Sequence, residues 1–503
     1  MDQKLAIEIM LSGESIFLTG PAGSGKTFVL NQFIRQAKHE GKKVAVTATT
    51  GLAATHLGGS TIHAWSGIGI HDQLPSNFFN RLSKSRVDTI KKADILVLDE
   101  VSMLHDYRLD MINDIVKNVR ENEEPFGGLQ VILCGDFFQL PPVTRGDQAP
   151  AKFVFSSQSW QELNPTIVYL NEQHRQNDDG FLGILEALRS GDIRRHHAET
   201  LMARIKVELP GDEPTELHTR NIDVDKINAK RLAELAGDEI SYDMQTTGSE
   251  NYVESLKKSC LASDVLRLKK GALVMAIKNS PNRQYANGSL GRIKDFEEEN
   301  LYPIVEFRNG KTVTMVPESW ELRDGDKKRA GLTQIPLRLA WAITVHKSQG
   351  MTLDAARVDL SRAFVEGMGY VALSRVRSLN DLTLNGINNM ALKVNSQALE
   401  IDKLLREQGE QASVTFAHLK KNADKRSKLR ISKAPKTGWT EKIAKMRLEY
   451  PNAYRPWTTE DDSTLQEKFQ QGTSIKKLSK QLGRHEGSIK IRLQKHFGED
   501  VIS

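Results

Sequence analysis

The sequence predicts an α/β protein with parallel sheets, and three observations lead to this class. Short apolar runs alternate with amphipathic stretches over the first 190 residues. A second set of this kind begins near Pro214 and resumes from Leu337 to Leu384. Between them, residues 271–331 alternate polar and apolar positions instead. Continuous apolar strands separated by helices are typical of parallel sheets that are covered on both faces.

The individual elements follow from these runs. The segments SIFLTG, VAVTATT, DILVLDE and LQVILCGD are predicted strands, and residues 26–39 are a predicted helix. In the middle segment, ALVMAIKN, GSLGRIKDF, YPIVEF and KTVTMVP are separated by turns that contain NG, EEEN and RNGK. This pattern predicts a small inserted antiparallel β-barrel over residues 271–331.

Composition bounds the possible classes of protein. At 503 residues the chain can hold about three to four domains, and 39% hydrophobic with 27% charged residues is an ordinary globular balance. No apolar run reaches the roughly 18–20 residues that would cross a bilayer, and the first residues match no export or transit pattern. Only Cys134 and Cys260 are present, which excludes a disulfide scaffold or a Cys-rich zinc site and fits a reducing cytoplasm.

Positive charge is concentrated at the C-terminal end. Residues 413–503 hold 20 Lys/Arg against 10 Asp/Glu, a local net charge of +10 in a chain of net charge +6, so the first 412 residues sum to about −4. We interpret residues 413–454 as a basic linker. Such a tail suggests a polyanionic partner, with nucleic acid first and an acidic membrane surface second. A solvated charged surface is the alternative.

The strongest motif is GPAGSGKT, which lies between a predicted strand and a predicted helix. It matches the phosphate-binding loop G-x-x-x-x-G-K-[ST], in which backbone N–H groups converge on phosphate oxygens. The predicted nucleotide-binding residues of this loop are Gly20, Pro21, Ala22, Gly23, Ser24, Gly25, Lys26 and Thr27. Lys26 can reach the β- and γ-phosphates of ATP, and the Thr27 hydroxyl can ligate Mg²⁺. A structural Gly-rich turn is the alternative.

Two further segments complete a predicted hydrolysis site. Asp99 and Glu100 end an apolar strand, where Asp99 would hold Mg²⁺ through water and Glu100 would orient or deprotonate the attacking water. Gln139 follows the next predicted strand and could contact the γ-phosphate. For Gln139 the alternative is a polar turn residue before two prolines.

Eight motifs in order give a specific resemblance. They are GPAGSGKT, TATTGLAA, TIHAWSGIG, LVLDEVSML, CGDFFQLPPV, LNEQHRQ, TVHKSQGMTLD and YVALSRVRS. Over about residues 1–390 the chain resembles superfamily 1 class B DNA helicases of the Pif (petite integration frequency) family. The segment DYRLDMINDIVKNVREN is similar to the family's own signature.

The resemblance implies two RecA-like motor domains, over residues 1–190 and 191–412, with ATP and Mg²⁺ between them. It implies that the insertion at 271–331 is an SH3-like barrel. In the nucleotide site it places Gln3, which would read adenine, together with Gly350, Arg175 and Arg375. The two arginines would reach the γ-phosphate from across the cleft. The expected catalytic residues are Lys26, Glu100, Gln139, Arg175 and Arg375.

The resemblance also implies a path for single-stranded DNA along both motor domains. The expected contacts are Thr50, His63, His346, Lys347, Ser348 and Gln349. Their hydroxyl and amide groups suit phosphate and sugar contacts without sequence preference. His63 and His346 could instead be a metal pair, but no cysteine or third histidine lies at ligand spacing. Trp65 could stack a base, wedge a duplex or belong to the core.

Beyond residue 412 the chain departs from the family. Residues 455–503 resemble a Myb/SANT-like or resolvase-like helix-turn-helix. Its expected core is Leu465, Phe469, Ile475, Leu478, Leu482, Ile489 and Leu493. The last helix is expected to expose Lys490, Arg492 and Lys495, as a helix facing a DNA groove would. A protein-docking module is the alternative.

The expected function is an ATP- and Mg²⁺-dependent helicase that translocates on single-stranded DNA, 5′→3′ by resemblance, in replication, repair, recombination or telomere maintenance. The expected partners are single-stranded DNA and single/double-strand junctions, with G-quadruplex DNA a further candidate and no membrane. We expect a monomer in a bacterial-type cytoplasm, associated with the nucleoid. The alternatives are a RecD-like or relaxase-type helicase and an ATP-switched DNA-binding regulator that separates no strands.

Overall fold

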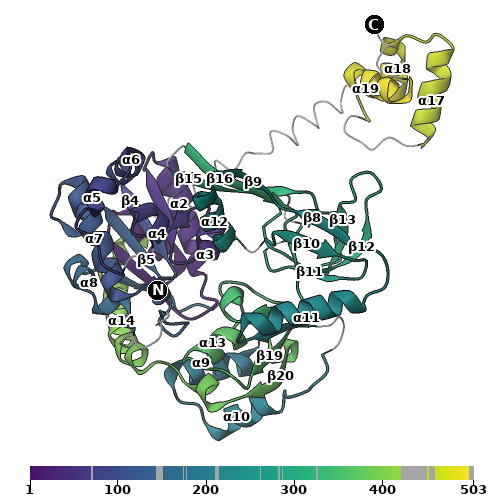
Figure 1. Ribbon diagram of the computed structural model, residues 1–503. Helices are drawn as coiled ribbons and strands as arrows, with labels where there is room; N and C mark the ends of the chain where they lie inside the picture. Colours follow the sequence, from purple (N-terminus) through teal and green to yellow (C-terminus); the bar gives the residue numbers. More distant parts are fainter. Residues whose placement is uncertain are drawn as a thin grey trace. The chain divides into compact units, whose positions relative to one another are not determined.

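The computed structural model describes residues 1–69, 72–142, 151–173, 175–176, 178–209, 214–260, 262–280, 282, 284–285, 287–324, 327–420, 450–452 and 459–497. The chain divides into two compact units, Met1–Lys420 and Lys421–Ser503. In the described residues, the first unit holds two parallel sheets and an inserted set of antiparallel strands, and the second unit is helical (Figure 1).

The first sheet has six strands in the order β3-β2-β4-β5-β1-β6, and all its pairings are parallel. The strands are β1 (Ile16–Thr19), β2 (Val44–Ala48), β3 (Ser60–Thr61), β4 (Ile95–Asp99), β5 (Gln130–Cys134) and β6 (Thr166–Tyr169). The helices are α1 (Gln3–Leu11), α2 (Lys26–His39), α3 (Gly51–Leu57), α4 (Ile62–Ser66), α5 (Phe78–Arg81), α6 (Lys84–Lys92), α7 (Asp106–Arg120) and α8 (Gln158–Leu163), with 3-10 turns η1 (Val101–Met103), η2 (Pro125–Gly128) and η3 (Val154–Ser156). The four strands predicted here are confirmed; β3 is too short, at two residues, to give a pattern.

Helices cover both faces of this sheet. Successive side chains of a strand point to opposite faces. Ile16 and Leu18 therefore pack in a core cluster with side chains of α1 and α2, whereas Phe17 packs in the other cluster with side chains of α7 and α8. All five residues of β4 are buried. This two-sided burial explains why the strands appear in the sequence as continuous apolar runs.

The second sheet has four strands in the order β18-β7-β19-β20, again all parallel. The strands are β7 (Thr215–His218), β18 (Ala342–Thr344), β19 (Ala356–Leu360) and β20 (Leu382–Ile387). The helices are α9 (Asp179–Ser190), α10 (Arg195–Met202), α11 (Asn221–Glu234) and α13 (Met368–Leu373), with 3-10 turns η4 (His346–Ser348), η5 (Leu379–Asp381) and η6 (Asn389–Leu392). The prediction of a second α/β set is confirmed, and the two parallel sheets are the two RecA-like domains.

The inserted strands are antiparallel and cover more of the chain than expected. They are β8 (Ile240–Asp243), β9 (Gln245–Gly248), β10 (Val265–Leu268), β11 (Leu273–Ala276), β12 (Leu290–Phe296), β13 (Pro303–Phe307), β14 (Thr312–Thr314), β15 (Glu318–Asp324), β16 (Lys327–Gln334) and β17 (Leu337–Leu339), with helix α12 (Glu250–Ser259). They form sheets in the orders β14-β13-β12-β11-β17, β15-β16-β9 and β10-β8. The insertion therefore extends from 240 to 339 rather than 271 to 331. Strand β9 gave no signal because all four of its residues are exposed.

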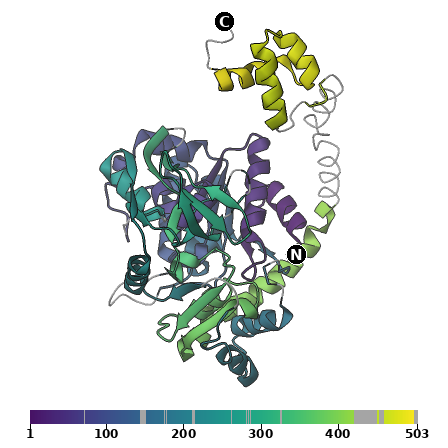
Figure 2. The same cartoon turned by 90° about the vertical axis from the view of Figure 1, so that its right-hand side faces the viewer.

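The first unit ends later than the predicted boundary at residue 412. Helix α14 (Ser396–Thr415) lies against strand β6, and a Cβ on Gly409 would come within 2.7 Å of the Tyr169 Cβ. Phe416, directly before the 3-10 turn η7 (Ala417–Leu419), and Leu419 at the end of that turn still pack on the core of the first sheet. The helix continues past 412 because its buried side must cover that sheet. Figure 2 shows the same unit from the side.

The second unit contains the three predicted helices, α17 (Thr459–Gln470), α18 (Ile475–Leu482) and α19 (Glu486–Phe497). The predicted core is confirmed: Leu465, Leu478, Leu482, Ile489 and Leu493 are buried, with Phe469, Ile475 and Phe497 packed against them. Arg492 is less exposed than predicted: its side chain is 23% exposed, and its guanidinium pairs with the Asp462 carboxylate of α17. Lys490 is exposed. The Lys495 side chain and most of the predicted linker, residues 421–449, lie outside the described residues.

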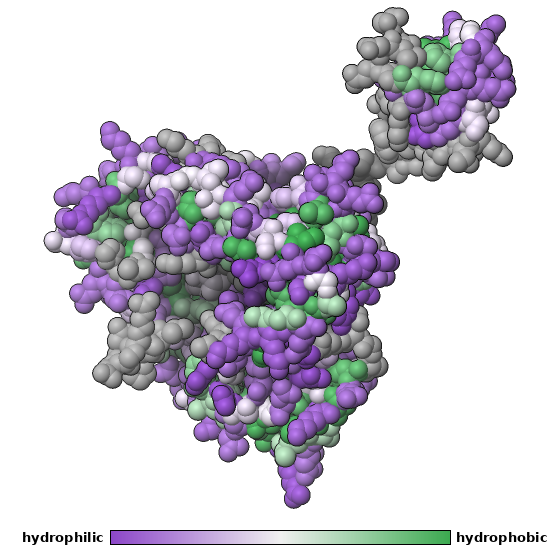
Figure 3. Space-filling model, turned by 45° about the vertical axis from the view of Figure 1, so that its right-hand side comes forward, coloured by the Kyte–Doolittle hydropathy of each residue, from purple (hydrophilic) through white to green (hydrophobic). Residues whose placement is uncertain are grey.

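Among the described helices, none is long and apolar enough to cross a membrane. The face of the protein in Figure 3 is mostly hydrophilic, with hydrophobic side chains scattered over it in small groups.

Candidate active site

The phosphate-binding loop joins β1 to α2 and depends on its glycines. Gly20 has φ +143°, and a Cβ there would come within 2.5 Å of the Leu170 carbonyl oxygen. Gly23 has φ +91°, and a Cβ there would come within 2.8 Å of the Arg175 Cβ. L-residues with side chains rarely adopt these conformations, so both positions require glycine. The loop is thereby held close to the segment that carries Arg175.

Polar groups in the loop face one another or lack a partner. Lys26 Nζ donates to the carbonyl oxygens of Gly20, at 2.9 Å, and Pro21, at 3.1 Å. Burial lowers the pKa of Lys26. The Ser24 hydroxyl is buried, and in the described residues it has no hydrogen-bond partner. Gln3, on α1, donates to the Ser24 carbonyl oxygen at 3.1 Å. These groups suit an anionic phosphate chain, which would accept from Lys26 and from the hydroxyl.

The acidic pair ends strand β4. Asp99 is buried, and burial raises its pKa. Glu100 has a left-handed φ of +56°, and burial together with the Asp99 charge raises its pKa to about 7. A carboxylate and the Thr27 hydroxyl are the hard oxygen ligands that Mg²⁺ prefers, and both residues line the same cavity. The Asp99 carboxylate accepts from the Glu100 backbone N–H at 2.8 Å, and burial still raises its pKa, so a bound cation would stabilise its charged form.

Two segments far apart in the sequence hydrogen-bond to Glu100. Gln349 Nε2 donates to Glu100 Oε2 at 2.9 Å, and the Thr49 hydroxyl donates to the Glu100 carbonyl oxygen at 2.8 Å. Gln349 lies in TVHKSQGMTLD, the motif of the second domain that is predicted to contact single-stranded DNA. Thr49 lies directly before Thr50 in TATTGLAA, the corresponding motif of the first domain. The predicted hydrolysis and DNA residues are therefore in direct contact at Glu100.

Arg175 and Arg375 meet beside the loop. Arg175 Nη1 donates to the Ser374 carbonyl oxygen at 2.9 Å, and burial lowers its pKa. Arg375 is 1% exposed, and burial, aided by the nearby Arg175 charge, lowers its pKa to about 9. The acceptors for Arg375 are the carbonyl oxygens of Val371, Ser348 and Met351 and the Ser374 hydroxyl. Two neighbouring guanidinium groups that hydrogen-bond to neutral oxygens suit a phosphate anion.

A cavity of about 920 Å³ collects most of the predicted residues. It is lined by Ala22, Gly23, Gly25, Lys26, Thr27, Thr50, Asp99, Glu100, Gln139, Arg175, His346, Lys347, Gln349, Gly350 and Arg375 among others. Gln139 is buried, donates weakly to Asp136 at 3.4 Å, and its Oε1 has no hydrogen-bond partner in the described residues. The nucleotide residues and four of the six DNA candidates thus share one cavity.

The side chains of the two remaining DNA candidates, His63 and Ser348, do not line this cavity. His63 Nε2 lies 2.7 Å from Arg108 Nη1, and burial with that neighbouring charge lowers the pKa of His63 to about 4. Ser348 is buried, and its hydroxyl donates to the Val345 carbonyl oxygen at 2.7 Å. Trp65 packs in the core of the first domain. Within the described residues, no group of three metal-ligating side chains includes His63 or His346.

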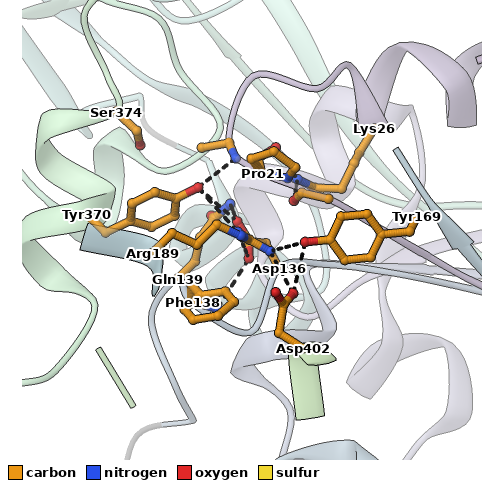
Figure 4. A network of polar contacts seen from close by, with 12 residues as sticks. Pro21, Lys26, Asp136, Phe138, Gln139, Tyr169, Arg189, Tyr370, Ser374 and Asp402 are labelled. Atoms are coloured by element: carbon orange, nitrogen blue, oxygen red, sulfur yellow. Dashed lines mark hydrogen bonds and ion pairs between the residues drawn. The ribbon is translucent and has the colours of Figure 1, made fainter. Parts of the chain in front are cut away.

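Sequence reasoning missed two sets of residues. Arg338, on β17, lines the cavity near Lys347, and its Nε is buried with no hydrogen-bond partner in the described residues. Arg189, on α9, is buried beside the phosphate-binding loop with Asp136, Tyr169 and Tyr370 (Figure 4). A lone arginine on an amphipathic helix or an exposed-looking strand gives no signal of burial.

A phosphate-binding loop on one parallel sheet, with residues of a second parallel sheet lining the same cavity, defines P-loop ATPases with tandem RecA-like domains, and this chain is of that class. Residues 2–198 match the PIF1-like helicase family, and residues 251–296 match the 2B domain of DNA helicase Pif1. The ATP-dependent DNA helicase Pif1 of Psychrobacter sp. (strain PRwf-1) is 38% identical over 515 residues, covering 90% of this chain and 78% of the relative.

Solved structures agree with this relationship. The chain has a TM-score of 0.71 and 30% identity to Bacteroides sp Pif1 in complex with ADP-AlF4, over 81% of this chain and 97% of that one. For Bacteroides Pif1 bound to ssDNA, the TM-score is 0.58 at 30% identity, with the same coverage. The chain belongs to the PIF1-like helicase family.

Proposed function

We propose that this protein, an ATP-dependent DNA helicase, moves 5′→3′ along single-stranded DNA and opens duplex at single/double-strand junctions. The direction follows the family resemblance. The observation that carries the coupling of hydrolysis to strand movement is the position of Glu100, which accepts hydrogen bonds from Gln349 and Thr49. A strand that contacts either motif would shift a group hydrogen-bonded to the candidate base. Hydrolysis and strand movement would therefore depend on each other.

Each residue of the cavity has a role in this scheme. Lys26 and the loop N–H groups would bind the β- and γ-phosphates, and Gln139 would contact the γ-phosphate. Glu100 would orient or deprotonate water, while Arg175 and Arg375 would stabilise charge that develops on the transferred phosphoryl group. Thr27 and Asp99 would hold Mg²⁺, which when bound supplies neutralisation of the phosphate charge. Gln3 would read adenine.

Hydrolysis kinetics test this function. We expect ATP hydrolysis to rise at least about tenfold when single-stranded DNA is added, because a strand bound to the motifs of Gln349 and Thr49 would bring Glu100 into its working position. Gln349→Ala should keep unstimulated hydrolysis and lose most of the stimulation. An ATPase rate that does not respond to DNA would favour the rival, an ATP-switched DNA-binding regulator.

Arg338 is expected to bind a phosphate of the strand. Arg338 is half-buried with its Nε buried, and its charge near Lys347 makes this part of the cavity positive. Burial together with the Arg338 charge lowers the pKa of Lys347. Arg338→Gln should weaken binding to single-stranded DNA and lower the slope of log K against log salt by about 0.7, the value expected when one phosphate is no longer neutralised.

The control for this prediction is Lys294→Gln, which removes an exposed cation from the same five-stranded sheet. Binding titrations across a salt series compare the two variants with the wild type. An Arg338→Gln slope equal to that of Lys294→Gln would remove Arg338 from the DNA path.

The basic C-terminal unit is expected to strengthen binding to duplex. Truncation after Lys420 keeps α14 and η7 whole and removes 19 Lys/Arg and 10 Asp/Glu. Each phosphate that the truncated protein no longer neutralises lowers the salt slope by about 0.9 on duplex, so four such phosphates change affinity about 100-fold between roughly 50 and 200 mM salt. Unwinding should fall more than ATP hydrolysis, because a tethered second site raises the local concentration of the motor at a junction.

Affinity for a 5′-tailed duplex, measured with and without the C-terminal unit, checks this expectation. Equal salt slopes and equal unwinding would favour the protein-docking alternative for residues 455–503.

We further propose that the protein acts as a monomer in a bacterial-type cytoplasm, associated with the nucleoid, in DNA repair, recombination or replication. G-quadruplex DNA is a candidate substrate. The free thiols of Cys134 and Cys260 support a reducing compartment.

A further inference from the structure

A buried polar network beside the cavity has no role in the scheme above. At its centre is Arg189, which is 4% exposed. Its guanidinium donates to Asp136 at 2.6 Å, to the Tyr370 hydroxyl at 3.3 Å, to the Tyr169 hydroxyl at 3.2 Å and to Asp402 at 3.2 Å (Figure 4). Its charge also lies over the Phe138 ring, 4.2 Å from the ring centroid. An arginine with this many partners is fixed in place.

One side of the network reaches the phosphate-binding loop. The Tyr370 hydroxyl accepts from the Ala22 backbone N–H at 2.8 Å and donates to Asp136 at 3.5 Å. Asp136 in turn accepts from the Gln139 amide at 3.4 Å. Tyr370 lies on α13, the helix that ends directly before Ser374 and Arg375. The Tyr370 hydroxyl therefore connects the phosphate-binding loop, helix α13 and the segment that carries Gln139.

The other side of the network leads away from the nucleotide. The Tyr169 hydroxyl donates to Asp402 of α14 at 2.9 Å and accepts from Arg189. The two partners of the Tyr169 hydroxyl, Asp402 and Arg189, both lie outside the phosphate-binding loop. Figure 4 shows the two tyrosines on opposite sides of the Arg189 guanidinium. The protein thus offers two tyrosines that share one arginine, of which one contacts the loop.

We propose that Tyr370, held by Arg189, is a positioning residue that sets Arg375 and Gln139 against the phosphate-binding loop. This inference rests on the proposed function, because it concerns the rate of the same hydrolysis. Removing the Tyr370 hydroxyl leaves the Ala22 N–H and one Arg189 N–H without their acceptor. The phosphate-binding loop and helix α13 then shift relative to each other. This shift weakens contacts to the transition state more than it weakens ATP binding.

The test compares Tyr370→Phe with Tyr169→Phe in the full chain. Each change removes one hydroxyl that accepts from Arg189, but only the Tyr370 hydroxyl also accepts from the phosphate-binding loop. We expect Tyr370→Phe to lower the DNA-stimulated kcat about tenfold with the KM for ATP within about twofold of the wild type, as expected when one buried hydrogen bond is removed. Tyr169→Phe should keep both parameters within about twofold.

A second readout needs no activity. Hydrogen exchange of the peptide that carries Ala22 should be faster in Tyr370→Phe than in wild type or Tyr169→Phe, because that N–H loses its acceptor. Equal losses of kcat in both variants, no loss in either, or a rise in KM with unchanged kcat would each overturn the proposal. A wild-type protein without DNA-stimulated hydrolysis would reject the proposed function instead, while the exchange comparison would still test the contact.

Discussion

Lys26→Ala is expected to lower ATP hydrolysis at least about 100-fold while leaving affinity for single-stranded DNA within about twofold. Lys26 is the loop cation, and its Nζ donates to the carbonyl oxygens of Gly20 and Pro21. Loss of a preorganised charge at a transferring phosphoryl group costs about 100- to 1000-fold in rate. The DNA candidates Thr50, His346 and Lys347 lie on other segments.

The control for Lys26 is Lys38→Ala, which removes an exposed cation near the end of the same helix, α2. Steady-state hydrolysis and single-strand binding are measured for both variants. Hydrolysis by Lys26→Ala at the rate of Lys38→Ala would contradict the assignment of the loop.

Removal of either cleft arginine is expected to act on the rate rather than on binding. Arg175→Ala and Arg375→Ala should each lower kcat about 1000-fold or more, the effect typical of arginines that reach a γ-phosphate, with a much smaller change in ATP affinity. Both side chains lie in the cavity next to Ser374. Hydrolysis kinetics and binding of a nucleotide analogue separate the two effects.

Because Arg375 is buried, its replacement can also destabilise the protein. Arg375→Lys keeps the charge but loses the planar fork, so it should keep the thermal midpoint closer to wild type and still lose most of kcat. Arg362→Ala removes an exposed arginine of the same domain and should change neither. A kcat near wild type in Arg375→Ala with intact folding would mean that Arg375 does not reach the phosphate.

The parts of the site that could be predicted are those written in short contiguous segments. A phosphate-binding loop needs eight neighbouring residues, and Asp99 with Glu100 ends a strand whose five residues are all buried. Parallel topology brings such strand ends to one edge of the sheet. The arginines came only from the family resemblance, because a single arginine carries no positional signal.

The parts that could not be predicted depend on contacts between distant segments. The Arg189 network combines residues from β6, α9, α13, α14 and the turn after β5, which no local pattern connects. Arg492 pairs with Asp462, 30 residues earlier, and is only partly exposed. The first unit extends past residue 412 because α14 packs back on strand β6. In each case contacts between distant segments determine which side chains are buried or paired, and the periodicity of a single helix does not contain that information.

Strand separation by polarity tests the central claim most directly, namely that hydrolysis in this cavity drives movement along one strand. Wild-type protein, Lys26→Ala and Lys38→Ala are compared with ATP on a duplex with a 5′ single-stranded tail and on its 3′-tailed counterpart. We predict that wild type and Lys38→Ala unwind the 5′-tailed duplex in an ATP-dependent reaction and leave the 3′-tailed duplex paired. Lys26→Ala should unwind neither duplex. Binding to both substrates with ATP hydrolysis but no unwinding would contradict the account.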